Sequence, residues 1–445
     1  MKWITPGDAE YDATRELFNR MIDRRPAIIA GCETVDDVRL ALDYAREHSL
    51  EVAVRSGGHS VAGMSTNDGG IVIDVRPMKS IDISVDDRTA TVGGGVTWGE
   101  FDAAAHAAGL VVTGGRVSTT GVSGFTLNGG SGWLERAYGL ACDSLVRVEL
   151  VTADGEEVIA SETENPDLFW ALHGGGGNFG VVTSLTFAMH PIGPLSVAGL
   201  MLWPADRAVE IATAYRDYAP TAPELLGSGL VALVAPQEDF VPPWLQGQNA
   251  VGVAMLHGGS IEDGNAAIAP LRALSPAVDL VEPMPYPMFQ SMIDDPPGLN
   301  HYWTAEYHST FPDEAIEVFV RYGAALPDAA SQLLLIPWGG AAGRVDPTST
   351  PMAQRSAQWI SHPFALWDDD SKAEAAIEWA RGFRRDISQF ASGGVYLNFV
   401  GREGQERIRA AFGESNYERL TRVKAKFDPD NLFRGNQNIE PAVLA

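Results

Sequence analysis

The stretch Arg55-Ser56-Gly57-Gly58-His59-Ser60 follows a short β-branched run and precedes the apolar run at 71–73. Adjacent glycines allow positive φ angles and a close backbone approach to a ligand, so successive N–H groups can converge on one anion such as a diphosphate. The imidazole of His59 would then lie beside the group that the diphosphate carries, and histidine is a competent nucleophile for a covalent bond to a cofactor. Taken alone, the pattern is more typical of a plain turn.

The segments around this stretch predict a βαβ unit. We expect a strand at 26–30, a helix at 34–48 whose first turn is closed by a capping box of Thr34 and Asp37, and a strand at 51–55. The glycine loop then follows the carboxyl end of a strand, where α/β proteins tend to bind ligands. Strands at 71–75, 81–85 and 89–92 and a helix at 97–108 come next, with His106 expected to face solvent.

A second glycine-rich segment runs from Thr113 to Trp133 and is interleaved with hydroxyl side chains. Such a composition makes a poor helix or strand but a good surface for backbone contacts with a polar ligand. A purely structural loop is the alternative interpretation.

A third glycine segment, at 175–180, formally satisfies the pattern GxGxxG. In a Rossmann fold these glycines follow a strand and open a helix, whereas here they follow a predicted helix at 166–172 and open a predicted strand at 181–187. NAD binding is therefore the weaker interpretation of this segment.

Several segments, taken together and in order, resemble one family. The loop at 55–60 with the run at 66–74, the Tyr-Gly-Leu-x-x-Asp sequence at 138–143, the Gly-Asn-Phe-Gly turn at 177–180, the Tyr-x-Asn pair at 396–398 and the ending at 426–439 are similar to the covalent FAD oxidases of the vanillyl-alcohol-oxidase type. Within these PCMH-type proteins the resemblance is to the berberine-bridge-enzyme-like group, which includes bacterial 6-hydroxynicotine oxidases and oligosaccharide oxidases. The matching motifs span 26–190 and 391–442, roughly half of the chain.

The resemblance implies FAD as the cofactor, bonded at its 8α-methyl to His59. Some members carry a second bond from a cysteine at the start of the glycine-rich run, but Val117 occupies that place, so we predict a single covalent link. Cys142 is interpreted as a buried small side chain. The predicted cofactor-binding residues are Arg55, Ser56, Gly57, Gly58, His59, Ser60, Val117, Thr120, Gly121, Gly124, Asn128, Gly132, Gly180, Val182, Tyr396, Asn398, Asn436 and Asn438.

The resemblance also implies an activity. Tyr396 is predicted to be catalytic and to remove a proton from an alcohol or amine, while hydride passes from the neighbouring carbon to the flavin and O2 is then reduced to H2O2. A tyrosine with its ordinary pKa near 10 is a poor base, so Arg55 or another cation would have to lower that pKa. A tyrosine merely packed on the flavin, a dehydrogenase that reacts poorly with O2, and a non-catalytic flavin-binding protein are the alternatives.

We predict an α+β fold with a PCMH-type FAD-binding domain at 1–192, a substrate-binding domain at 193–390 and a segment at 391–445 that returns to the FAD domain. The middle region alternates strand-like runs (199–203, 230–234, 249–256, 332–337) with helical ones (205–218, 261–274, 313–322, 371–390), which favours an antiparallel sheet covered by helices. A β-rich run at 393–399 is expected to present Tyr396 and Asn398 on one face.

Candidates for the substrate pocket are the aromatic residues of the middle region, although aromatic residues in a sheet are more often core. They are Tyr286, Phe289, Tyr302, Trp303, Tyr307, Trp338 and Trp367. His301 and His308 could share a helix face, but they lack a third partner at metal-ligand spacing, so no metal site is predicted.

Composition limits the partners. The net charge of -26 disfavours nucleic acid and anionic membranes. The start lacks the apolar region of a signal peptide and no run is long enough for a membrane helix, so we expect a cytoplasmic protein. Two cysteines exclude a disulfide framework. The expected partners are a small-molecule substrate and O2, with the chain a monomer or homodimer.

Overall fold

The computed structural model describes residues 1–294 and 296–443. Its first sheet confirms the predicted βαβ unit, because two parallel strands flank a third and the helix α2 (Val35–Glu47) joins them. The strand order is β1 (Lys2–Ile4), β2 (Ile28–Gly31), β4 (Ile71–Asp74) and β3 (Val52–Arg55). Thr34 and Asp37 form the predicted capping box at the start of α2. The loop at 56–60 therefore leaves the carboxyl end of β3.

A second, wholly antiparallel sheet lies beside the first. Its strands are β5 (Ile81–Ser84), β6 (Thr89–Gly93), β10 (Val181–Ala188), β8 (Leu145–Val151) and β9 (Glu157–Ser161), in that order. The helices of this region are α1 (Tyr11–Arg15), α3 (Trp98–Ala107), α4 (Val122–Leu127), α5 (Glu135–Tyr138) and α6 (Pro166–Ala171), and the short strands β7 (Leu110–Val111) and β11 (His190–Pro191) pair with each other. The glycine-rich segment at 113–133 follows β7 and contains α4.

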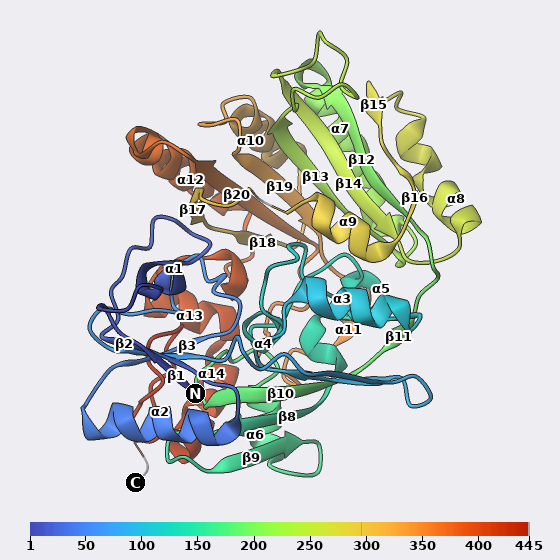
Figure 1. Ribbon diagram of the computed structural model, residues 1–445. Helices are drawn as coiled ribbons and strands as arrows, with labels where there is room; N and C mark the ends of the chain where they lie inside the picture. Colours follow the sequence, from blue (N-terminus) through green and yellow to red (C-terminus); the bar gives the residue numbers. More distant parts are fainter. Residues whose placement is uncertain (295, 444–445) are drawn as a thin grey trace.

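The middle of the chain forms the largest sheet, which is antiparallel as predicted. Its strands are β12 (Ser196–Pro204), β13 (Leu226–Val234), β14 (Asn249–His257), β15 (Val278–Asp279), β16 (Glu282–Met284), β17 (Asn300–Trp303), β18 (Glu306–His308), β19 (Gln332–Pro337) and β20 (Trp359–Trp367). Figure 1 shows this sheet above the two smaller ones.

Helices cover one face of the large sheet and form a core with it. They are α7 (Ala208–Tyr218), α8 (Ile261–Arg272), α10 (Asp313–Gly323) and α12 (Ala373–Ile387). We call the part built on the two smaller sheets the first lobe and the part built on the large sheet the second lobe. Helix α9 (Tyr286–Met292) packs against α3 of the first lobe, and α11 (Gly340–Arg344) packs against α5. Side chains alternate between the two faces of each strand. The face of the large sheet that these helices do not cover is therefore turned toward the glycine-rich segments.

The end of the chain returns to the first lobe, as predicted. Helices α13 (Gln405–Phe412) and α14 (Glu414–Phe427) lie among the N-terminal strands in Figure 1. The buried Lys424 ammonium pairs with Asp428 at 2.5 Å and donates to the backbone oxygen of Asn178 at 2.8 Å. A buried ion pair holds its partners firmly because removing either one leaves an uncompensated charge. This pair therefore fixes the end of the chain against the Gly-Asn-Phe-Gly turn.

Three local predictions were wrong. The run at 393–399 is not a strand: Leu397–Phe399 is a single 3₁₀ turn, preceded by irregular backbone. His301 and His308 lie on the strands β17 and β18 rather than on a helix, because both pair with β20, a strand that the sequence pattern did not predict. His106 is half-buried on α3, and its Nε2 is enclosed without a hydrogen-bond partner.

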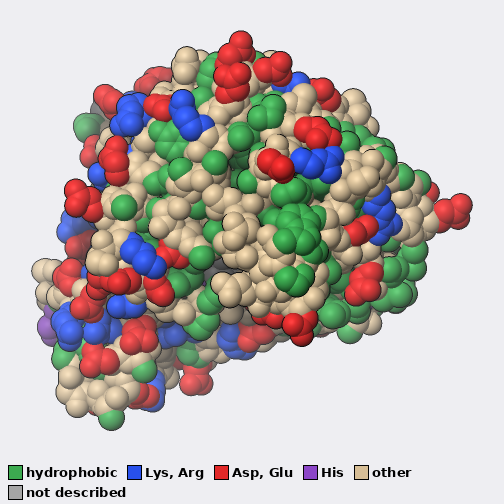
Figure 2. All heavy atoms as spheres, turned by 90° about the horizontal axis from the view of Figure 1, so that it is seen from above, with side chains coloured by type: hydrophobic (Ala, Val, Ile, Leu, Met, Phe, Trp, Pro, Cys, Tyr) green, Lys and Arg blue, Asp and Glu red, His purple; other side chains and the backbone are tan. Residues whose placement is uncertain are grey.

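The surface carries the acidic excess of the sequence. Figure 2 shows Asp and Glu side chains spread over the face seen from above, with basic side chains scattered among them. No helix in the described part of the chain is long and apolar enough to cross a bilayer.

Candidate functional site

The first two glycine segments touch through their backbones. A Cβ atom at Gly57 would lie 2.1 Å from the backbone nitrogen of Gly121, and one at Gly121 would lie 2.2 Å from the nitrogen of Gly57. Only glycine fits at either position, since backbone atoms cannot move aside as a side chain can. Ser56 and Ser123 both donate to the carbonyl oxygen of Gly94 at 2.8 Å, which ties the two loops to the second sheet.

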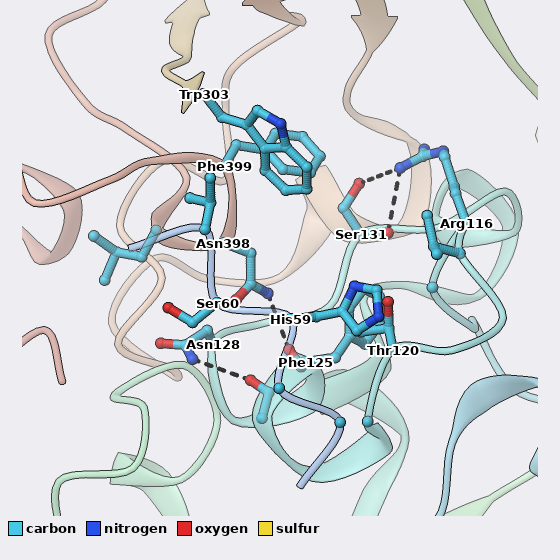
Figure 3. A pocket seen from close by; sticks show the side chains of 18 of the residues that line it. His59, Ser60, Arg116, Thr120, Phe125, Asn128, Ser131, Trp303, Asn398 and Phe399 are labelled. Atoms are coloured by element: carbon cyan, nitrogen blue, oxygen red, sulfur yellow. Dashed lines mark hydrogen bonds between the residues drawn. The ribbon is translucent and has the colours of Figure 1, made fainter. Parts of the chain in front are cut away.

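These loops line a cavity of about 580 Å³ between the two lobes. Most of the predicted cofactor-binding residues line it together. They are Ser56, Gly57, Gly58, His59, Ser60, Val117, Thr120, Gly121, Gly124, Asn128, Gly180, Val182, Asn398 and Asn436. We call the wall that these residues form the cradle. Figure 3 shows His59, Thr120, Asn128 and Asn398 around it.

His59 lies in the cradle with its ring held on two sides. Its imidazole stacks on Phe18 with ring centroids 4.5 Å apart, and its Nε2 is 2.8 Å from Thr119 Oγ1. Burial, followed by the charge of Arg55, lowers the pKa of His59 to about 4, so the ring is neutral at pH 7. A neutral imidazole retains the lone pair that a nucleophile needs.

Four predicted residues do not line the cavity: Arg55, Gly132, Tyr396 and Asn438. The Arg55 guanidinium turns away and donates to the carbonyl oxygens of Thr14 and Glu16. It therefore does not supply the cation that was expected beside Tyr396. A Cβ at Gly132 would lie 2.0 Å from the carbonyl oxygen of Gly114, so this glycine serves backbone packing behind the cradle.

Tyr396 is 1% exposed and lies behind the glycine-rich segment. Its hydroxyl oxygen accepts hydrogen bonds from the backbone nitrogens of Gly130 (2.9 Å) and Ser131 (2.8 Å) and from Asn398 Nδ2 (3.0 Å). Burial outweighs these hydrogen bonds and raises the pKa of Tyr396 above its ordinary value of 10.0. The structure thus brings Tyr396 and Asn398 together, as predicted, but places only Asn398 on the cavity wall.

The third glycine segment contributes to the same wall. Gly176, Gly177, Asn178 and Gly180 line the cavity, after α6 and before β10. Asn178 Oδ1 accepts from the backbone nitrogen of Ile439 at 3.0 Å, and Asn436 Nδ2 donates to Gly177 O at 2.7 Å. The order of helix, glycines and strand is the reverse of a Rossmann turn, as predicted.

Other predicted features have structural roles. Cys142 is fully buried, as expected, and does not line the cavity. Asp143, which ends the Tyr-Gly-Leu-x-x-Asp sequence, receives two hydrogen bonds from the buried Arg355, at 2.8 and 2.7 Å. This pair ties the turn that precedes β8 to the loop between α11 and β20. Within the described residues, no group of three His, Cys, Asp or Glu side chains could hold a metal.

The large sheet supplies the opposite wall of the cavity, which we call the sheet wall. Of the aromatic candidates, only Trp303 belongs to it; Tyr286, Phe289, Tyr302, Tyr307, Trp338 and Trp367 do not line the cavity. Figure 3 places Trp303 and Phe399 on the side away from Asn128 and Thr120. Residues that the sequence did not reveal make up most of this wall: Leu200, Gly229, Val231, Leu233, Ala254, Gln332, Leu334, Ile336, His362 and Phe364.

The sequence held one weak signal for the missed residues. The run at 359–367 is apolar and rich in aromatic residues, which favours a strand, but Pro363 in its middle argues against a central strand. In the structure this run is β20, which pairs with β17, β18 and β19.

Comparison with known proteins identifies the family. Residues 26–161 match the family model described as FAD binding domain, and residues 395–440 match the model described as berberine and berberine like. The (R)-6-hydroxynicotine oxidase of Paenarthrobacter nicotinovorans is 32% identical over 98% of this chain and 96% of its own. The xylooligosaccharide oxidase of Thermothelomyces thermophilus is 28% identical over 97% of this chain and 91% of its own.

The fold agrees with these relatives. The crystal structure of 6-hydroxy-D-nicotine oxidase from Arthrobacter nicotinovorans covers 99% of this chain and 98% of its own, with a TM-score of 0.88 at 28% identity. The protein therefore belongs to the FAD-linked oxidoreductases with a berberine-like C-terminal segment. It is an enzyme of flavin-dependent oxidation.

The residues of the cradle fit a flavin dinucleotide. A Cβ at Gly124 would meet no atom within 4 Å, so this glycine faces open space rather than packed protein. Asn436 lines the cavity, and its Oδ1 is buried without a partner, which leaves an acceptor near the end of the chain for a polar ligand. The volume lies within the range of about 300–1,000 Å³ that is usual for cofactor and ligand sites.

Proposed function

We propose that the cradle holds FAD through one covalent bond, from His59 to the 8α-methyl of the flavin. The neutral, stacked ring of His59 on the cavity wall is the observation that carries this proposal. Nε2 is engaged by Thr119, which leaves Nδ1 as the ring nitrogen for the bond. Val117 lines the cavity where a second, cysteinyl bond would be made, and Cys142 lies outside the lining, so a single link is proposed.

We further propose that the enzyme oxidises a CH–OH or CH–NH group of a small molecule and reduces O2 to H2O2. When bound, FAD supplies the two-electron chemistry: it takes a hydride from the substrate carbon and passes the electrons to O2. The chain's part is to orient the substrate, exclude water and hold the proton that leaves its O–H or N–H. Relatives named as hydroxynicotine and xylooligosaccharide oxidases support both bond types. A cytoplasmic location and a monomeric or homodimeric state stay predictions of the sequence.

The proposed catalytic role of Tyr396 is a separate question. Its hydroxyl lies behind the cradle and its pKa is raised, so the geometry favours a role in holding Gly130 and Ser131 in place. Tyr396→Phe keeps the ring and removes the hydroxyl. If Tyr396 only supports the cradle, the variant reduces its flavin on substrate addition within about tenfold of wild type; a loss of 10²–10⁴-fold restores Tyr396 as the base.

The attachment is tested by His59→Ala. The wild-type protein should be yellow, and its flavin should stay with the protein after acid precipitation. His59→Ala should lose this acid-stable flavin completely, whereas Cys142→Ala should keep it. Colourless wild-type protein, made with ample riboflavin, would overturn the proposed function; acid-stable flavin in His59→Ala would overturn the attachment site alone. Peroxide release separates an oxidase from a dehydrogenase or a flavin-binding protein.

A further inference from the structure

The sheet wall is almost entirely apolar. Strands β12, β13, β14 and β19 present aliphatic side chains to the cavity, and β17 and β20 add Trp303 and Phe364. Within the described lining, the only fully charged side chains are Arg116 and Asp294. A wall of this composition recognises a ligand by the apolar surface that it buries.

Arg116 is paired with Glu135 inside the protein, whereas Asp294 is held by hydrogen bonds from Ser118. Arg116 donates to Ser131 O at 3.2 Å and Ser131 Oγ at 3.0 Å, and its guanidinium lies 3.5 Å from Glu135. Asp294 accepts from the backbone nitrogen of Ser118 at 2.6 Å and from the same residue's hydroxyl. Figure 3 shows the Arg116 contacts with Ser131 beside the cavity. The Arg116 charge is thus balanced within the protein, and the oxygens of the Asp294 carboxylate already accept two hydrogen bonds.

His362 and the half-buried Gln332 are the polar side chains of this wall, and His362 is the more deeply buried of the two. It lies on β20, opposite Leu334 of β19, and is 1% exposed. Its Nδ1 is 2.8 Å from the carbonyl oxygen of Thr304. A carbonyl oxygen only accepts, so Nδ1 carries the hydrogen and Nε2 carries the lone pair. No protein group donates to Nε2, which is buried and without a partner.

Aromatic rings fix the orientation of this imidazole. Phe399 stacks on it at 4.4 Å with an interplanar angle of 3°, and Trp303 and Phe364 meet it edge-on at 5.7 and 5.3 Å. Phe399 follows Asn398, which lines the cradle. The ring therefore lies where the sheet wall meets the cradle, and its Nε2 acceptor is buried without a partner in the protein.

The apolar wall and its two polar side chains together select a ligand. A sugar would bring many hydroxyl groups to a wall that offers only His362 and Gln332 as partners, and a buried hydroxyl left without a partner weakens binding. A protonated amine would bring a positive charge into a cavity whose sheet wall carries no carboxylate and whose lining includes the cationic Arg116. A molecule with one hydroxyl on an apolar body meets neither cost.

Resting on the proposed function, we propose that the substrate is a neutral, predominantly apolar alcohol and that His362 Nε2 accepts its hydroxyl proton. The O–H bond breaks and its proton goes to Nε2, while the C–H bond breaks and its electron pair leaves as hydride to the cofactor, so that the C=O bond forms. O2 then takes the two electrons and the two hydrogens as H2O2, and Nε2 is neutral again. His362 touches the reacting oxygen and is thus a catalytic residue.

The kinetic test measures flavin reduction without oxygen, by stopped flow, with a fixed panel: benzyl alcohol, 2-naphthalenemethanol, cyclohexanol, 1-hexanol, xylobiose and 2-phenylpyrrolidine. We expect the apolar alcohols to reduce the wild-type flavin fastest, and His362→Gln and His362→Ala to slow that step by about 10²–10⁴-fold with unchanged covalent flavin. The exposed His48→Gln is the control. Reduction only by the sugar or the amine, or by no member of the panel, overturns the substrate class; unchanged rates in both His362 variants overturn the catalytic role.

A second test needs no turnover. Protein with ¹⁵N-labelled imidazole rings has nine histidines, each with an Nδ1 and an Nε2 resonance, and His362→Gln assigns the pair of interest. At pH 7 we expect hydrogen on Nδ1 only, and a shift of the Nε2 resonance when benzyl alcohol is added. Hydrogen on Nε2, or no response to the alcohol, contradicts the proposal. The protonation state of the ring and the shift of the Nε2 resonance can both be measured without bound cofactor. A colourless preparation would therefore overturn the proposed function, whereas the test of His362 would still give a result.

Discussion

The two walls of the cavity are built in different ways. The cradle consists mainly of loop backbone and glycines, and its shape comes from close contacts such as that of Gly57 with Gly121. The sheet wall consists of side chains on alternate positions of strands whose other faces form a helix-covered core. A backbone surface binds the polar parts of a cofactor shared by a whole family, whereas a side-chain surface can be changed one residue at a time. The contrast predicts that substitutions in the cradle destroy cofactor binding. Substitutions on the sheet wall should change which substrates are oxidised, and how fast, while the cofactor stays bound.

The largest effect should come from adding one carbon to the cradle. In Gly57→Ala the new Cβ would lie 2.1 Å from the Gly121 nitrogen, which belongs to the backbone and cannot turn away. Overpacking of a core typically costs about 1–3 kcal/mol and sometimes more, and here the two loops must separate. We expect loss of about 3 kcal/mol or more of unfolding free energy, measured by urea unfolding, and little bound flavin. Gly7→Ala, where no atom lies within 4 Å, is the matched control and should change neither quantity. Normal flavin content in Gly57→Ala would contradict the backbone account of the cradle.

The sheet wall offers a matched pair on one strand. Leu335 on β19 is fully buried in the helix-covered core, whereas its neighbour Leu334 lines the cavity. Leu335→Ala should therefore cost about 2–5 kcal/mol of unfolding free energy, because it leaves an internal void. Leu334→Ala only enlarges an existing cavity, so we expect a loss below about 1 kcal/mol and a changed rate of flavin reduction by the alcohol panel. Equal losses of stability in the two variants would show that the cavity face is packed like the core.

The same contrast explains how far the sequence could be interpreted. The cradle could be predicted because its glycine segments, together with the motifs around them, resemble those of a known family; the glycines alone are more typical of plain turns. The sheet wall could not, because the face on which a side chain lies depends on knowing the strand. Pro363 concealed β20, and with it His362 and Phe364. The 3₁₀ turn at 397–399 likewise replaced the predicted strand, although a hydrogen bond still joins Asn398 to Tyr396.

The seam between the two lobes, away from both walls of the cavity, carries an effect that depends on pH. Asp102 on α3 is buried against α9 and accepts a hydrogen bond from Gln290 Nε2 at 3.1 Å. Burial raises the pKa of Asp102 from 3.8 to about 8, so the folded protein retains a proton that the unfolded chain releases. A protonated carboxyl also offers a donor near the buried Gln290 Oε1, which lacks a partner.

This proton makes stability depend on pH with a definite sign. Between pH 4 and 8 the folded state binds more protons than the unfolded state, so the unfolding free energy falls as the pH rises, by at most about 1.4 kcal/mol per pH unit. Below pH 4 both states are protonated and this dependence disappears. Asp102→Asn is neutral at every pH, so the difference in unfolding free energy between the variant and wild type should grow steadily from pH 5 to pH 8. Urea unfolding at pH 5, 6, 7 and 8 measures it, and a constant difference would mean that Asp102 is ionised in the folded protein. In that case the seam would hold a buried carboxylate rather than a neutral carboxyl hydrogen-bonded to Gln290.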